Sequence, residues 1–298
     1  MDVSVILPVY NAEQYLSIAI ESVLAQSFSG NYEILIADDA STDSTAEIIK
    51  TYLTKYPSLI KAVFRKDNIG ANPNSLSLCL AATGNYLAFI DADDIWLTKD
   101  KLQRQYDYLE AHQELGAVCS NSYFINNYGV KSGKGKGKKG LVSFEEMILG
   151  HTDIFCSSLV CRNEVYKRMV EDSAWYIKNG CFNDTVWAFW LSFHNLLYRM
   201  EEVFSAYRVL INSACHSTDI ERQAALSKKY FNKKLCFLFS HEYPIDKKMD
   251  IISQEYDYVF KNAFYEGEMK VRNTKAFMIG KRIKKIASRL FPRKAKCY

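Results

Sequence analysis

The chain has 298 residues, of which 48% are hydrophobic and 24% charged, and its formal net charge is +4. This is the composition of an ordinary globular protein, and the length allows one large domain or two modest ones. The sequence contains no run of about 18 apolar residues and no basic leader segment, so we expect neither a membrane-spanning helix nor a signal peptide, and therefore a cytoplasmic protein.

Strands and helices are predicted to alternate along the first part of the chain. Apolar and β-branched runs predict strands at residues 3–10, 32–37, 60–65 and 86–90. Helical spacing of apolar residues predicts a helix capped by Asn11 that runs to Leu24, and two more helices at 46–56 and 75–82, the last after a loop at 66–74. This alternation indicates a parallel, doubly wound sheet with right-handed crossovers.

Acidic residues follow two of these strands. Asp38 and Asp39 follow the second strand, and Asp91, Asp93 and Asp94 follow the fourth. Ligands of such sheets bind outside the carboxyl ends of the strands, so these side chains are expected at one edge. On an extended chain Asp91 and Asp93 would point to the same side, about 6 to 7 Å apart along the backbone.

A cation would offset the repulsion within this acidic group. A donor set made only of oxygen favours Mg²⁺ or Mn²⁺ over zinc, and these ions keep open positions for substrate phosphates. The alternative is a solvated acidic turn that precedes a helix. We also expect Trp96, Trp187 and Trp190 to pack in the core rather than against a ligand.

Several other kinds of site are disfavoured. The first strand is followed neither by the glycine pattern of dinucleotide-binding proteins nor by a phosphate-binding glycine-lysine loop. The basic, glycine-rich residues 134–140 are most simply a loop. The eight cysteines are scattered without zinc-binding spacing, which favours buried free thiols in a reducing compartment.

The C-terminal residues 281–291 interleave basic and apolar residues at helical spacing. Such a helix can lie on an anionic membrane surface, or it can pack on the domain and expose its basic face to solvent. No recognised nucleic-acid-binding motif accompanies the charge, so we expect no nucleic-acid partner.

Five motifs in order resemble those of the inverting family 2 glycosyltransferases, and they lie at residues 5–12, 38–43, 68–70, 82–89 and 91–96. The resemblance implies the α/β fold of the nucleotide-diphospho-sugar transferases (GT-A), a Rossmann-like, mostly parallel sheet flanked by helices, with a helical C-terminal extension. It implies a catalytic domain at 1–217, with a nucleotide-binding half at 1–115 and an acceptor half at 116–217. Residues 218–298 would form the helical region with the basic tail.

The resemblance also implies roles for individual residues. The nucleotide would be bound by Pro8, Tyr10, Asn11, Asp39, Asn68, Asp91 and Ala92. Asp91, Asp93 and Asp94 would hold Mn²⁺ or Mg²⁺, and Arg208 and His216 would bind the diphosphate. Asp184 would be the general base, although many members carry Glu-Asp or His-Asp where this chain has Asn183 and Asp184. The alternative role of this pair is to cap a helix at 185–193.

The chain departs from the family pattern at one further place. Many members have Ala-Arg-Asn before the Gly-Asn-Tyr turn, whereas this chain has Asn74, Ser75 and Leu76. A donor contact made by that arginine therefore cannot be carried over.

The activity that the resemblance implies is the metal-dependent, inverting transfer of a sugar from a UDP-sugar to a glycan or lipid-linked saccharide. The setting would be bacterial surface polysaccharide or lipopolysaccharide assembly at the inner face of the cytoplasmic membrane, with peripheral contact through the basic C-terminal helix. One alternative is a sugar nucleotidyltransferase, which would need a glycine-rich phosphate loop near the first strand. Another is a non-catalytic nucleotide-sugar-binding protein, against which the retention of Asp91, Asp93 and Asp184 argues.

Overall fold

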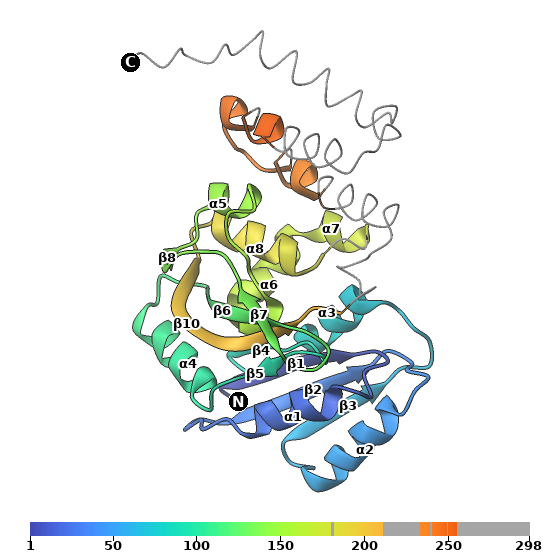
Figure 1. The fold of residues 1–298 in the computed structure, drawn as a ribbon. Helices are drawn as coiled ribbons and strands as arrows, with labels where there is room; N and C mark the ends of the chain where they lie inside the picture. Colours follow the sequence, from blue (N-terminus) through green and yellow to red (C-terminus); the bar gives the residue numbers. More distant parts are fainter. Residues whose placement is uncertain (180–181, 211–229, 231–232, 239, 249, 255–298) are drawn as a thin grey trace. The chain divides into compact units, whose positions relative to one another are not determined.

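The computed structural model describes residues 1–179, 182–210, 230, 233–238, 240–248 and 250–254. The chain divides into two compact units (Figure 1). The first consists of residues 1–147 and 151–210, and the second of residues 148–150 with residues 211–298. His216, the boundary predicted at residue 217 and the basic residues 281–291 lie outside the described residues.

The first unit begins with a regular alternation of strands and helices, as the sequence predicts. The elements are β1 (Val3–Val9), α1 (Leu16–Leu24), β2 (Tyr32–Asp38), α2 (Thr45–Lys55), β3 (Ile60–Phe64), α3 (Ala71–Ala81) and β4 (Tyr86–Phe89). The strand order is β3-β2-β1-β4, and all three pairings are parallel. Parallel strands joined by helical crossovers confirm the predicted α/β architecture.

The rest of the unit extends the same sheet with strands of both directions. Its elements are β5 (Ile95–Trp96), α4 (Lys101–Ala111), β6 (Ala117–Ile125), β7 (Lys131–Lys134), β8 (Gly140–Leu141), α5 (Phe144–Ile148), η1 (Cys156–Ser158), β9 (Val160–Arg162), α6 (Asn163–Asp172), α7 (Ala174–Lys178), α8 (Asp184–Phe193) and β10 (Leu197–Arg208). The order continues from β4 as β9-β6-β10-β5. β9 is antiparallel to both neighbours, β6 and β10 are parallel, and β5 is antiparallel to β10.

Helices cover both faces of the sheet, and the alternation of side chains along each strand divides the core accordingly. Val5 of β1 is fully buried in one apolar cluster with Ile20 of α1 and Ile49 of α2. Phe89 of β4 faces the other way, and its ring centroid lies 5.1 Å from that of Trp187 on α8. Trp96, Trp187 and Trp190 are each at most 3% exposed, so the prediction that they pack in the core is confirmed.

The start of α1 differs from the prediction. The helix begins at Leu16 after the cap position Tyr15, and no side chain caps it, so the prediction that Asn11 caps this helix is wrong. Asn11 instead adopts a left-handed backbone conformation with φ of 46°, and its Oδ1 accepts a hydrogen bond from Thr42 N at 2.8 Å. A short polar side chain suits that conformation. Asn11 thus joins the loops that follow β1 and β2.

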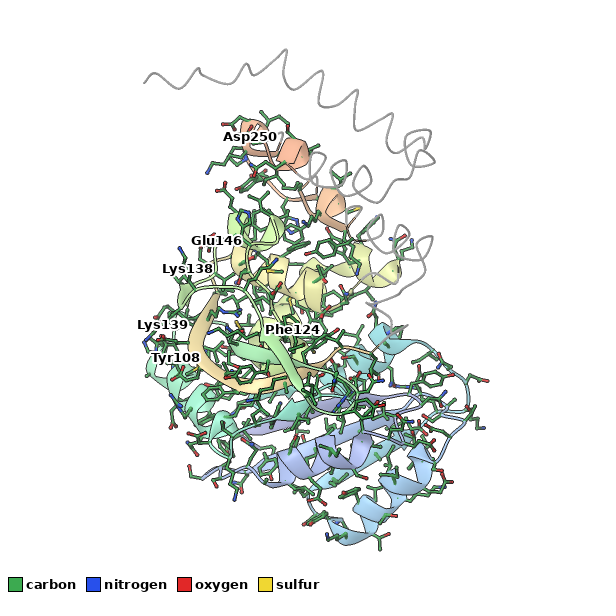
Figure 2. All side chains as sticks on the ribbon, in the orientation of Figure 1. Tyr108, Phe124, Lys138, Lys139, Glu146 and Asp250 are labelled. Carbon is green, nitrogen blue, oxygen red and sulfur yellow. The ribbon has the colours of Figure 1, made fainter. Side chains whose placement is uncertain are left out.

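Two predicted loops are shorter than expected. α3 begins at Ala71 rather than at residue 75, because Pro73 falls in the first turn, where a missing N–H leaves no helical hydrogen bond unmade. Residues 131–134 form β7, which pairs antiparallel with β6, so the basic, glycine-rich segment begins inside a strand. Lys138 and Lys139 follow it, just before β8 (Figure 2).

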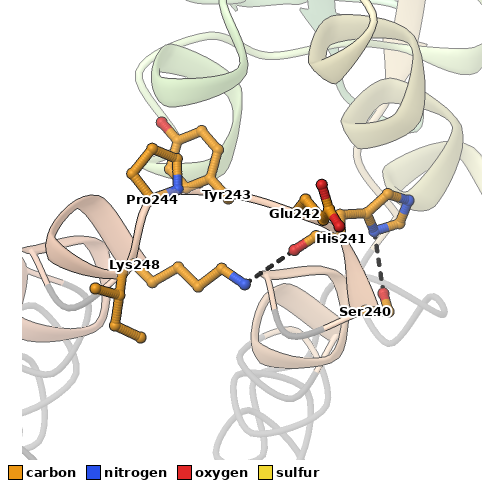
Figure 3. A pocket seen from close by; sticks show the side chains of 7 residues that line it. Ser240, His241, Glu242, Tyr243, Pro244 and Lys248 are labelled. Carbon is orange, nitrogen blue, oxygen red and sulfur yellow. Dashed lines mark hydrogen bonds between the residues drawn. The ribbon is translucent and has the colours of Figure 1, made fainter.

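The described part of the second unit contains helical residues at 233–238, 245–248 and 250–254. A hollow in this unit is lined by residues 240–245 and Lys248 (Figure 3), and Lys248 Nζ donates a hydrogen bond to His241 O at 2.9 Å. None of the predicted site residues lines it. Among all the residues described, no helix is both long enough and apolar enough to cross a membrane.

A buried carboxylate ties β1, β2 and β4 together at their amino ends. Glu33 of β2 is 1% exposed, and its Oε1 accepts hydrogen bonds from Ser4 Oγ and Thr83 Oγ1, both at 2.7 Å. Its Oε2 accepts one from Lys61 Nζ at 2.6 Å. Burial alone would raise the pKa of the Glu33 carboxyl, but the hydrogen bonds from Lys61, Thr83 and Ser4 lower the pKa to about 2.

We therefore expect Glu33→Gln to lower the free energy of unfolding at pH 7 by about 1.5 to 3 kcal/mol, the usual loss for hydrogen bonds to a charged group. The pKa in the folded protein is below the ordinary value of 4.5, so the carboxylate stabilises the fold above about pH 4.5. This contribution is lost as the pH falls toward 2. Urea unfolding at pH 7 and pH 3 should therefore give a smaller difference between variant and wild type at pH 3.

The control is Glu47→Gln, because the Glu47 side chain is 68% exposed and lies 3.9 Å from Lys50. We expect a change of less than about 0.5 kcal/mol there, as for exposed ion pairs in general. A pH-independent difference for the Glu33 variant would contradict the role assigned to its charge.

Candidate active site

Most of the predicted nucleotide and metal residues follow the carboxyl ends of β1, β2 and β4. Residues 91–94, here called the acidic loop, follow β4 and form a turn in which Asp94 N donates a hydrogen bond to Asp91 O at 3.0 Å. The chain is therefore not extended here, and the extended backbone assumed for the spacing of Asp91 and Asp93 is wrong. A turn brings carboxylates from one short segment toward a common centre.

Burial raises the pKa values of the carboxyls in this region, and at Asp91 neighbouring negative charges add to the rise. Burial, the negative charge of Asp93 and the negative charge of Asp184 raise the pKa of Asp91 to about 7. Burial also raises the pKa of Asp93, although the nearby cation of Arg208 opposes the shift. Asp184 lies far along the chain from the acidic loop, so the fold brings two separate acidic segments together. A bound cation would offset this repulsion.

Asp94 is held by the protein itself. It is 1% exposed, its Oδ2 accepts a hydrogen bond from Ser157 Oγ at 2.5 Å, and its Oδ1 accepts one from Arg208 N at 2.9 Å. Burial and the charges of Asp91 and Asp93 raise the pKa of Asp94 well above its ordinary value. Both carboxylate oxygens of Asp94 thus accept a hydrogen bond from the protein, and its predicted role as a metal ligand stays a prediction.

Asp91 and Asp93 are then the carboxylates that fit a divalent cation. Two acidic side chains on a turn leave coordination positions for phosphate oxygens, which is how Mg²⁺ is usually bound. Within the described part of the chain, no three His, Cys, Asp or Glu side chains gather as a ligand set. Any cation here would therefore take much of its coordination from substrate and water.

The turn η1 lies behind the acidic loop and holds it in place. Besides its bond to Asp94, Ser157 Oγ accepts a hydrogen bond from Asp91 N at 3.0 Å, and Ser157 O accepts one from Trp96 Nε1 at 3.0 Å. The hydroxyl and the backbone of one serine thus fix both ends of the loop. Trp96 lies under the loop, as expected from the sequence.

A buried lysine supports η1 from beneath. Lys101 is fully buried, its Nζ lies 4.1 Å from the Trp96 ring centroid, and it donates a hydrogen bond to Gln105 Oε1 at 2.7 Å. Gln105 Nε2 in turn donates to Ser158 O at 2.8 Å. Burial lowers the pKa of Lys101 to about 7. The hydrogen bonds from Lys101 to Gln105 and from Gln105 to Ser158 thus connect the residue packed on Trp96 to η1.

Arg208 joins the acidic loop to the turn between β6 and β7. Its Nε donates a hydrogen bond to Asp93 O at 2.8 Å and its Nη1 donates one to Asn126 O at 2.9 Å. The guanidinium carbon lies 4.4 Å from the centroid of the Tyr15 ring. The side chain is 4% exposed, so it positions the loop, and its predicted contact with phosphate stays a prediction.

The predicted nucleotide pocket is organised by Asp39. Its two carboxylate oxygens accept hydrogen bonds from Ile69 N at 2.9 Å and from Gly70 N at 2.8 Å. Gly70 has φ of 91°, which glycine adopts readily, and Asn68 Oδ1 also accepts from its N–H at 3.1 Å. Asp39 thus fixes the loop that contains Asn68.

The remaining predicted nucleotide residues lie nearby. Asp39 N donates a hydrogen bond to Val9 O at 2.9 Å, so Pro8 and Tyr10 flank a backbone position bonded to this aspartate. Tyr10 is 50% exposed, which leaves its ring available to a ligand. Ala92 is 8% exposed and can offer little beyond its backbone.

Asp184 is the first residue of α8. The cap residue is Asn183, whose side chain accepts from Val186 N, so the predicted capping by this pair is confirmed for Asn183. Asp184 Oδ1 accepts a hydrogen bond from Thr185 N at 2.7 Å. A helix N-terminus stabilises a carboxylate in its ionised form.

Four supporting residues were not predicted from the sequence. Ser157, Lys101 and Gln105 belong to no recognisable motif. Arg65 donates from Nε to Asn74 Oδ1 at 2.7 Å, and Asn74 Nδ2 donates to Ala37 O at 2.8 Å. The only indication of the Asn74 contacts in the sequence is that the chain departs from the family pattern at Asn74.

Comparisons with known proteins agree on one family. The sequence model of Glycosyl transferase family 2 matches residues 4–170. An uncharacterised protein of Mycobacterium tuberculosis is 42% identical over 110 residues, which are 37% of this chain and 32% of that protein. The Escherichia coli UDP-Glc:alpha-D-GlcNAc-diphosphoundecaprenol beta-1,3-glucosyltransferase WfgD is 34% identical over 128 residues, which are 43% of this chain and 48% of WfgD. The matched region thus spans about a third to a half of the length of these relatives.

Solved structures share the fold. The crystal structure of S. aureus TarS in complex with UDP-GlcNAc has a TM-score of 0.64, with 15% sequence identity. The match covers 94% of this chain and 79% of that one. The GT-A fold predicted from the sequence is confirmed.

The hydrogen bonds of Ser157 predict its effect on stability. Ser157→Ala removes the donor to the buried Asp94 carboxylate and the acceptor of Asp91 N, so we expect the free energy of unfolding to fall by about 1 to 3 kcal/mol. Ser158→Ala is the matched control, since its hydroxyl bonds only Phe155 O within the same turn. Urea unfolding of the two variants measures the difference, and equal losses would rule out the special role of Ser157.

Proposed function

The chain belongs to Glycosyl transferase family 2, and we propose that it transfers a sugar from a nucleotide-diphospho-sugar, a UDP-sugar, to a hydroxyl group of a saccharide. The observation that carries this proposal is the meeting of Asp91, Asp93 and Asp184 in one electrostatic field at the carboxyl ends of the strands. Such a site can bind a cation, a diphosphate and an acceptor hydroxyl together.

Asp91 and Asp93 would hold Mn²⁺ or Mg²⁺. When bound, this cation neutralises the negative charge that develops on the leaving nucleoside diphosphate. The raised pKa of Asp91 supports the assignment, because burial and the negative charges of Asp93 and Asp184 raise it and a divalent cation would offset those charges. Asp94 and Arg208 keep the acidic loop in its turn through Asp94 Oδ1 and Asp93 O.

Asp184 is the proposed general base. It would accept the proton of the acceptor hydroxyl as that oxygen attacks the anomeric carbon and the bond between the sugar and the diphosphate breaks. A single displacement of this kind inverts the anomeric configuration. The position at the start of α8 favours the ionised, proton-accepting form of the carboxylate.

The nucleotide would occupy the edge of β1 and β2. The exposed Tyr10 ring can stack on a base, and Asp39 with residues 68–70 forms a polar wall beside it. A uracil base is supported by the name of WfgD and by the UDP-GlcNAc bound to TarS. Pro8, Asn11 and Ala92 complete the proposed lining, and Arg208 with His216 stay the proposed diphosphate contacts.

The proposed acceptor is a glycan or a lipid-linked saccharide of bacterial surface polysaccharide biosynthesis. WfgD acts, by its name, on a saccharide carried by diphosphoundecaprenol. An acceptor of that kind would place the protein at the inner face of the cytoplasmic membrane, with residues 281–291 as the basic contact. The catalytic domain at 1–217 and the helical region at 218–298 are part of the same proposal.

Donor binding gives the first test. We expect one UDP-sugar from a panel of UDP-, GDP- and dTDP-sugars to bind the full chain in the presence of Mn²⁺, as measured by titration calorimetry. Asp93→Ala should weaken this binding at least about tenfold, because a ligand of the cation is lost. Equal binding with and without metal, in wild type and variant alike, would overturn the metal assignment.

Turnover gives the second test. We expect Asp184→Asn to bind the donor as tightly as wild type and to lower kcat by about 10²- to 10⁴-fold, the usual loss when a general base is removed. Asp107→Asn, an exposed aspartate on α4, is the control and should keep full activity. A variant of Asp184 with unchanged kcat would exclude that residue as the base.

A further inference from the structure

The first unit contains a polar cavity, formed where the segment between β7 and β8 meets the residues after α5. Its volume is about 300 Å³. Lys138, Glu146, His151 and Thr152 line its polar side, and Leu141 and Val142 its apolar side. Lys138 and Glu146 are labelled in Figure 2, before β8 and on α5. None of the residues assigned to sugar transfer lines this cavity.

Two buried hydrogen-bond donors beside this cavity have no hydrogen-bond partner among the described residues. Thr152 lines it and is 5% exposed, and its Oγ1 makes no hydrogen bond. Arg199 of β10 is 1% exposed, and its Nη2 likewise makes none, while its Nη1 donates to Asp153 O at 2.5 Å. Buried polar groups in folded proteins nearly always have a hydrogen-bond partner, so these two donors indicate a missing one.

Both donors converge on Gly137, which lines the same cavity. A Cβ atom at Gly137 would lie 2.4 Å from Thr152 Oγ1 and 2.8 Å from Arg199 Cζ. The φ angle of Gly137 is 130°, in the region that favours glycine. Only a residue without a side chain leaves the hydroxyl and the guanidinium this close to the backbone.

The charge near these donors is incompletely balanced. Among the ion pairs of the described residues, none includes Arg199. The Asp153 carboxylate accepts a hydrogen bond from Lys136 N at 2.8 Å, and Glu146 Oε2 accepts one from Ser143 Oγ at 3.1 Å. A buried guanidinium without a carboxylate partner favours an anion from outside the chain.

We propose that this cavity binds a phosphoryl group, held by Thr152 Oγ1, Arg199 Nη2 and Lys138 Nζ. A hydroxyl, a guanidinium and an ammonium on three separate segments suit the tetrahedral oxygens of phosphate better than a planar carboxylate. The apolar wall of Leu141 and Val142 can contact the organic part of a phosphate ester. The inference is independent of the proposed sugar transfer, because it involves none of the same residues.

Thermal unfolding of the full chain tests this site. We expect the Tm to rise saturably with inorganic phosphate and with glycerol phosphate, and to stay unchanged with sodium chloride or acetate at equal ionic strength. A larger rise in Tm with glycerol phosphate than with inorganic phosphate would identify a phosphate ester as the ligand. Equal rises would identify the free phosphate ion. If neither compound raises the Tm, the proposal is overturned and water is the partner of both donors. If acetate raises the Tm equally, the choice of a phosphoryl group is overturned.

Thr152→Val separates binding from folding. The hydroxyl that it removes bonds none of the residues that the structure describes, so the variant should unfold at the same or a higher temperature without ligand. Its affinity for phosphate should fall by roughly 10- to 100-fold, the equivalent of one hydrogen bond to a charged group. An unchanged affinity in this variant would overturn the site.

Three further variants complete the design. Lys138→Gln should weaken phosphate binding several-fold, whereas Lys139→Gln, the adjacent lysine outside the lining, should not. Asp93→Ala should keep the full rise in Tm, which excludes phosphate bound at the proposed donor site as its cause. If the Asp93 variant loses the rise in Tm, the phosphate binds at the proposed donor site, and the proposed phosphate site at Thr152 and Arg199 is contradicted. Donor titration on Thr152→Val reports separately on sugar transfer.

Discussion

The buried hydrogen bonds of the Asp94 carboxylate are the constraint on which the site depends. One oxygen accepts from Ser157 of η1 and the other from the backbone of Arg208 on β10. One donor belongs to a short helical turn and the other to a strand of the sheet, and in a buried setting each bond is stronger than it would be in water. The turn that carries Asp91 and Asp93 is therefore fixed before any ligand arrives.

This arrangement divides the acidic residues into two kinds. The carboxylate oxygens of Asp94 and Asp39 accept hydrogen bonds from the protein. Asp94 thereby holds the acidic loop, and Asp39 holds residues 68–70. Burial raises the pKa values of Asp91 and Asp93, and the charges of Asp93 and Asp184 add to the rise at Asp91. Hydrogen bonds within the protein thus fix the loops before binding, while a few charges stay uncompensated. A charged substrate can bind such a site with little rearrangement of the protein.

The sequence predicted those parts of the structure that depend on local pattern. Alternating apolar runs predicted β1 to β4, and the acidic residues after β2 and β4 predicted the edge where the site lies. Contacts between distant residues left no such pattern, so Ser157 was missed although it bonds Asp94, 63 positions away. Asn11 was misassigned as a helix cap because its partner, Thr42, lies on another loop.

The long reach of Arg208 bears on the order in which this protein folds. The residue bonds Asp94 across 114 positions of the chain, and it belongs to the last strand of the sheet. During synthesis β1 to β4 can pair early through short crossovers, but the acidic loop lacks part of its frame until β10 has left the ribosome. Chains that end before residue 208 would keep every acidic residue of the loop and Asp184, together with the hydrogen bonds from Ser157, but would lack the hydrogen bonds that Arg208 donates to Asp94 and to Asp93 O.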